Sequence, residues 1–189
     1  ENVVITPRDL EVLEFLLDMK FATITEIHQK FFRKLRNGTT SHSEWYARER
    51  MRLLWKHGHV ESVRFRYTDR KYFIATEQAY WFLYNSRMGS VCVGQPIRQI
   101  DIRTFEHDAL LIKLRLHLEE KESISNWKSD RSLRRAFSFQ DGPYRDYVPD
   151  AVYQNTDQDV VAFELELTMK SKKRYREKLN KYRDIMAGW

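Results

Sequence analysis

The sequence predicts a mixed α+β fold, and three observations predict it. Apolar residues recur at helical spacing near the start of the chain, alternation typical of strands appears near residues 60 and 71, and a longer helical pattern returns after residue 103. We therefore expect a first domain over residues 1–85, a linker over 86–102 that contains Gly89, Gly94 and Pro96, and a second, small α/β domain over 103–189.

Capping signals predict the first two helices. Thr6 precedes Pro7 and lies three residues before Asp9, which is the spacing of a capping box with proline at the first helical position. The same spacing recurs between Thr23 and Glu26, before a short helix that we expect to end near residue 32. An apolar stripe follows each start, so both helices are expected to pack into a core.

The third helix carries two different faces. Ser41 and Glu44 have capping-box spacing, and Gly58 is expected to end a helix that runs to about His57. Its apolar face contains Ala47, Met51 and Leu54, and a sector well away from it contains Trp45, Arg48, Arg52 and Lys56. A basic face that includes an aromatic residue is typical of a recognition helix that contacts a DNA groove. The alternative, for this helix taken alone, is an ordinary solvent-exposed face.

A basic hairpin is predicted next. Residues 60–66 alternate as a strand does, residues 67–70 form a turn, and residues 71–75 return as a second strand. The basic residues near its tip are Arg64, Arg66, Arg70 and Lys71. Three short helices followed by such a hairpin predict a winged helix-turn-helix. A fourth helix is expected from Thr76 to about Tyr84.

The second domain is predicted as a helix to about Lys121, a short strand at 124–127, a helical turn at 129–135, two strands at 147–153 and 160–167, and a basic final helix. Glu164 and Glu166 lie two apart on the last strand, so they project from one face, beside Asp150 if the two strands are neighbours. Three such carboxylates need a cation, either a divalent metal or one of Lys170, Lys172 and Lys173. The alternative to such a cation site is that Glu164 and Glu166 face solvent on an edge strand.

These motifs carry a resemblance. The helix–strand–strand–strand–helix order with Pro149-Asp150 and Glu164-Leu165-Glu166 resembles the PD-(D/E)xK nuclease core. The whole chain resembles the replication-relaxation family of plasmid and mobile-element proteins, through Ile5–Asp9, Phe105–Asp108, Trp127 with Ser129-Asp130, and Lys178-Leu179 with Tyr182. The resemblance implies Asp150 and Glu164 as ligands of Mg²⁺ or Mn²⁺. It also places Glu166 where the motif has its catalytic lysine, which argues against catalysis.

Charge and composition indicate two basic segments and argue against a membrane-spanning, secreted or disulfide-bonded protein. Residues 30–71 carry twelve Lys/Arg against four Asp/Glu, and residues 168–189 carry eight against two. No apolar run approaches the ~20 residues of a membrane span, and no signal peptide is expected. Cys92 is the single cysteine, which excludes an internal disulfide and a cysteine-based zinc site and agrees with a reducing cytoplasm. The resemblance implies that this cytoplasm is bacterial.

Three functions stay open. The first is a double-stranded DNA-binding protein that needs no cofactor and acts in plasmid replication, mobilisation or transcriptional control, as the resemblance implies. The second is a metal-dependent endonuclease or nickase that uses Asp150, Glu164 and Glu166. The third is an interaction module that forms a homodimer or recruits a relaxase or replication initiator, with Trp81, Trp127 and Trp189 as interface anchors.

Overall fold

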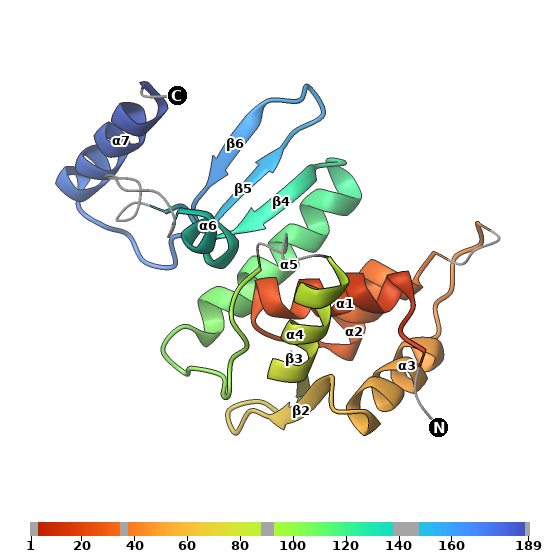
Figure 1. Cartoon of the computed structure of the whole chain (residues 1–189). Helices are drawn as coiled ribbons and strands as arrows, with labels where there is room; N and C mark the ends of the chain where they lie inside the picture. Colours follow the sequence, from red (N-terminus) through yellow and green to blue (C-terminus); the bar gives the residue numbers. More distant parts are fainter. Residues whose placement is uncertain (1–3, 35–37, 88–92, 138–147, 188–189) are drawn as a thin grey trace.

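The computed structural model describes residues 4–34, 38–87, 93–137 and 148–187. Over these ranges the chain is a mixed α+β protein, as the sequence predicted, and it contains two three-stranded antiparallel sheets (Figure 1). The first half consists of α1 (Pro7–Met19), β1 (Ala22–Thr23), α2 (Ile24–Ile27), the wide helical turn η1 (His28–Phe32), α3 (Trp45–Lys56), β2 (Val60–Arg64), β3 (Lys71–Ala75) and α4 (Glu77–Ser86). The second half consists of α5 (Phe105–Lys121), β4 (Ser125–Ser129), α6 (Asp130–Phe137), β5 (Ala151–Gln154), β6 (Val160–Phe163) and α7 (Lys172–Ala187).

Two of the three predicted capping boxes form. The hydroxyls of Thr6 and Thr23 accept from the backbone N–H three residues later, and the carboxylates of Asp9 and Glu26 accept in return. The third prediction was wrong, because α3 begins at Trp45 with Glu44 in the cap position and no side-chain cap bond. The Glu44 carboxylate accepts from the hydroxyl of Thr25 at 2.7 Å and pairs with Arg48, so it is not available for a capping box.

The first sheet has the order β1-β3-β2, with β3 in the centre. The hairpin β2–β3 was predicted, and Gly58 ends the preceding helix with a φ of 74°, a conformation that favours glycine. The strand β1 was not predicted, since it has only two residues and pairs Ala22 with Phe73 of β3. It ties the hairpin to the start of α2.

The second sheet has the order β4-β5-β6, and two of its three strands are shorter than predicted, because 147–153 and 160–167 were expected where β5 and β6 are observed. The last strand ends at Phe163 rather than Leu167, because its partner β5 begins at Ala151, opposite Phe163. Beyond that point Leu165 donates its backbone N–H to the Asp150 carboxylate at 2.7 Å, in place of a ladder bond. Gly89 of the expected linker, Cys92 and Trp189 lie outside the described residues.

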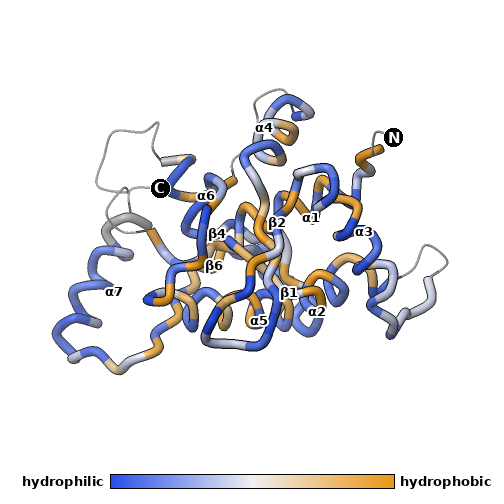
Figure 2. The backbone as a smooth tube through the Cα atoms, turned by 90° about the horizontal axis from the view of Figure 1, so that it is seen from below, coloured by the Kyte–Doolittle hydropathy of each residue, from blue (hydrophilic) through white to orange (hydrophobic). Residues whose placement is uncertain are grey.

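One hydrophobic core runs through both halves (Figure 2). Leu13 and Leu16 of α1 belong to the same cluster as Ile112 of α5 and Trp127 of β4. The described part of the expected linker, residues 93–102, also packs: Val93 and Ile100 are at most 9% exposed. Among the described residues no helix is long and apolar enough to cross a bilayer.

A buried carboxylate joins the two halves. Asp18 of α1 is 8% exposed and accepts from Arg115 of α5 at 2.9 Å. Its other oxygen accepts from the hydroxyls of Ser129 and Ser132, each at 2.5 Å. Nearby, Arg131 of α6 donates to the carbonyl of Leu17 at 2.6 Å. These contacts position the second half against α1.

Candidate nucleic-acid interface

The orientation of α3 is fixed by its apolar face. Ala47, Met51 and Leu54 are fully buried, as the sequence predicted. Arg50, on the flank, pairs with the buried carboxylate of Asp9 and so attaches α3 to α1. The remaining sector of the helix is therefore held outward.

The outward sector carries the residues predicted to contact DNA. Trp45, Arg48, Arg52 and Lys56 are all exposed, with Trp45 at 59%. Arg48 pairs with Glu44 at 2.5 Å and Arg52 pairs with Glu49 at 2.9 Å, both within one turn of the helix. Such exposed pairs are worth only ~0.3–0.5 kcal/mol each, so a phosphate can displace the carboxylate from either guanidinium.

The hairpin places further cations opposite α3. Arg64 and Lys71 are directly paired across β2 and β3, so two like charges face each other. Arg70 precedes Lys71, and the Arg66 guanidinium lies over the Tyr67 ring, 4.8 Å from its centroid. All four cations are exposed. A like-charged pair at a hairpin end is unfavourable by itself, and a bound anion would relieve the repulsion.

A groove of about 1190 Å³ lies between α3 and the hairpin. Its cations are Arg48, Arg52, Arg64, Arg70 and Lys71, and the acids that line it are Glu49 and Asp69. Three of the predicted residues, Trp45, Lys56 and Arg66, are exposed outside this groove. The structure therefore brings five of the eight predicted residues into one cationic groove.

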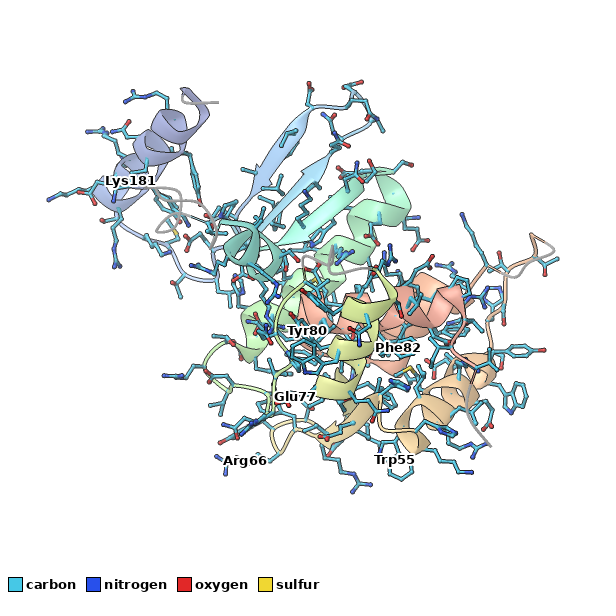
Figure 3. All side chains as sticks on the ribbon, in the orientation of Figure 1. Trp55, Arg66, Glu77, Tyr80, Phe82 and Lys181 are labelled. Atoms are coloured by element: carbon cyan, nitrogen blue, oxygen red, sulfur yellow. The ribbon has the colours of Figure 1, made fainter. Side chains whose placement is uncertain are left out.

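Sequence reasoning missed Trp55 in this groove. Its side chain lines the groove and is 56% exposed, on the same side of the molecule as Arg66 (Figure 3). Trp55 follows Arg48 by seven residues and Arg52 by three, so helical spacing would have placed it on the basic face. Thr25 of α2 also lines the groove, and only the tertiary packing of α2 against α3 brings it there.

The predicted carboxylates meet at the end of β6, although not on a strand. Lys178 Nζ of α7 lies 2.6 Å from Glu164 Oε2 and 3.1 Å from Glu166 Oε1. Lys170 pairs with Glu166 at 2.5 Å, as expected for one of the three candidate lysines, whereas Lys172 and Lys173 are exposed. The missed cation is Lys178, which is within reach only because α7 folds back on this segment.

Electrostatics separate the two proposed metal ligands. Burial raises the pKa of Glu164, helped by the charges of Asp150 and Glu166 and opposed by Lys178. Burial would also raise the pKa of Asp150, but hydrogen bonds from His107 and from the Leu165 N–H outweigh it, so the pKa is lowered. Glu164 also accepts from the Tyr182 hydroxyl. Protein groups thus favour the charged form of Asp150, whereas Lys178 and the Tyr182 hydroxyl offset the burial of Glu164 only in part.

Among the described residues, no group of three or more His, Cys, Asp or Glu side chains is arranged to hold a metal ion.

The predicted tryptophan anchors differ in exposure. Trp127 is 9% exposed and stacks on Tyr153, with ring centroids 5.8 Å apart, so it is a core residue and not a surface anchor. Trp81 on α4 is 57% exposed.

Comparison of the chain with protein-family models, with curated proteins and with solved structures gives no match. The resemblance to the replication-relaxation family therefore stays a prediction from the sequence motifs.

Proposed function

We propose that this chain is a double-stranded DNA-binding protein whose first half works as a winged helix-turn-helix. The order α1, β1, α2, α3, β2, β3 supports this proposal, because it places a basic helix beside a basic hairpin. In this arrangement α3 enters the major groove and the hairpin contacts the backbone. Binding requires no cofactor.

The observation that carries the proposal is the cationic groove. Five Lys/Arg side chains from α3 and the β2–β3 hairpin converge there on an exposed surface, with Trp55 beside them. Arginine reads guanine through two parallel hydrogen bonds and also binds phosphate, so Arg48 and Arg52 suit base edges or backbone. The apolar face of α3 is buried, so the helix needs little ordering when DNA binds.

We further propose a non-catalytic role for the second half. Glu166 stands where the nuclease pattern has lysine, and Lys178 and Lys170 neutralise the carboxylates. The motif resemblance implies plasmid replication, mobilisation or transcriptional control in a bacterial cytoplasm as the setting. We expect supercoiled plasmid to stay uncut with Mg²⁺ or Mn²⁺. Cleavage that Asp150→Ala abolishes would favour the nuclease function instead.

The groove is tested by a titration of labelled duplex DNA. Replacing Arg48 and Arg52 with alanine should weaken binding at least tenfold and reduce the slope of log affinity against log salt by about 2, because two phosphate contacts are lost. The matched control replaces Arg98 and Arg103, which are 92% and 85% exposed and do not line the groove. Equal effects of the two pairs, or no effect of the first, would contradict the proposal.

A further inference from the structure

The proposed DNA groove leaves the second basic block of the chain without a role. That block forms α7, which is hydrophilic along most of its length (Figure 2). Residues 172–183 contain seven Lys/Arg and one acid, Glu177, and Leu179 is their one aliphatic residue. A helix of this composition gains little from packing on a core, so its charge calls for a separate explanation.

The inner stripe of α7 is held by polar contacts. Tyr175, Lys178 and Tyr182 are half-buried, and they follow one another at helical spacing. Lys178 pairs with Glu164 and Glu166, and Tyr182 donates to Glu164. These bonds define which face of α7 is turned outward, and they also cancel the charge of Lys178.

The outward face keeps its positive charge. Lys172, Lys173, Arg174 and Arg176 are exposed, and within the described part of the chain no carboxylate pairs with any of them. The groove arginines differ in this respect, since Arg48 and Arg52 each have a carboxylate partner one turn away. Lys172 and Arg176 are one turn apart, with Arg183 on the same side two turns further on.

The two cationic surfaces lie at opposite ends of the molecule. Figure 1 places α7 far from α3 and β2, and in Figure 3 Lys181 lies at the end opposite to Arg66 and Trp55. The Asp18 contacts join the halves between these two ends. One surface therefore does not extend the other.

We propose that the outward face of α7 binds the backbone of a second DNA duplex, so that one molecule bridges two DNA segments. From residue 172 to 183 the helix covers about 16 Å at ~1.5 Å per residue, which matches roughly five phosphates of one strand. A membrane surface fits less well, because a lipid-binding helix needs a broad apolar face. The bridging claim rests on the proposed function of the groove.

The test captures the full-length protein on an immobilised duplex and measures how much of a second, labelled duplex is retained. The α7 variant carries Lys172→Gln, Lys173→Gln and Arg176→Gln, and its matched control carries Arg98→Gln, Lys113→Gln and Lys121→Gln. We expect the α7 variant to bind a single duplex within about threefold of the wild type. Retention of the second duplex should fall at least tenfold, with no change in the control, and Lys173→Glu alone should lower it partly.

The outcomes separate the two proposals. If the α7 variant retains the second duplex as well as the wild type does, the bridging proposal is overturned. A dimer that joins two duplexes through its two grooves would give this result. If Arg48→Ala with Arg52→Ala leaves single-duplex binding unchanged while the α7 variant weakens it, the groove proposal fails and α7 is the DNA-binding surface. If the α7 variant loses binding to phosphatidylserine vesicles but retains the second duplex normally, α7 binds a lipid surface and the bridging proposal is overturned.

Discussion

At the scale of single residues, buried polar groups decide how the two halves meet. Asp18 receives three hydrogen bonds from α5, β4 and α6, and it is almost fully buried. A buried carboxylate with these partners is tolerated, whereas a buried guanidinium without its carboxylate is costly. The Asp18 site is therefore sensitive to the loss of one partner.

Replacing Asp18 with alanine should lower the free energy of unfolding by about 3 kcal/mol, because Arg115 loses a partner and two serine hydroxyls lose their acceptor. Urea denaturation measures this change. Glu120→Gln, at an exposed pair with Arg33, serves as the control and should leave the midpoint nearly unchanged. A midpoint for Asp18→Ala equal to that of the wild type would show that the network does not hold the halves together.

His107 gives a pH dependence of defined sign. The carboxylate of Asp108, 3.6 Å from the ring, and that of Asp150, hydrogen-bonded at 3.2 Å, raise its pKa from 6.5 to about 10. A raised pKa means that the charged ring stabilises the fold fully below pH 6.5 and that this contribution disappears as the pH rises toward 10. The stability difference between the wild type and His107→Gln should shrink over that range. An NMR titration of the ring with a midpoint near 6.5 would contradict this expectation.

At the scale of elements, the hairpin carries a pair of like charges at its end. Arg64 and Lys71 repel each other across β2 and β3, while Phe65 anchors the hairpin by stacking on Phe105 of α5, with centroids 4.3 Å apart. The hairpin therefore tolerates an unfavourable charge pair at its end. This arrangement is expected where the cations serve a ligand.

Lys71→Glu tests the role of this charge pair, since it turns the repulsion between Arg64 and residue 71 into an attraction. We expect the free energy of unfolding to rise by about 0.5 kcal/mol and DNA affinity to fall at least fivefold. Thermal melting and the duplex titration measure the two effects on the same sample. Lys121→Glu, a charge reversal on α5 away from the groove, is the control. Unchanged DNA affinity in Lys71→Glu would remove the hairpin from the interface.

At the scale of the whole molecule, the continuous core predicts cooperative unfolding. The same buried cluster contains residues of α1, α5 and β4, and the Asp18 bonds cross between the halves. We expect one calorimetric transition, with equal calorimetric and van't Hoff enthalpies, rather than two. Two separate transitions would show that the halves are independent domains joined by a linker, as the composition of residues 86–102 suggested.

The sequence by itself determined the helices, the hairpin and the two faces of α3. These features depend on capping, turn residues and hydrophobic periodicity, which act over a few neighbouring residues. The structure agrees at α1, α2, β2 and β3, and at α3 except for its predicted capping box. The outward set Arg48, Arg52 and Arg64 followed from the same local rules. The length of β6 did not, because a strand ends where its partner ends.

Only the tertiary structure decided which distant groups meet. Neither the pairing of Lys178 with Glu164 and Glu166 nor the burial of Asp18 under Arg115 leaves a periodic signal, since each joins residues from separate elements. The same holds for the groove itself, which exists because β1 and α5 hold the hairpin opposite α3. Long-range packing, and not local propensity, sets these distances.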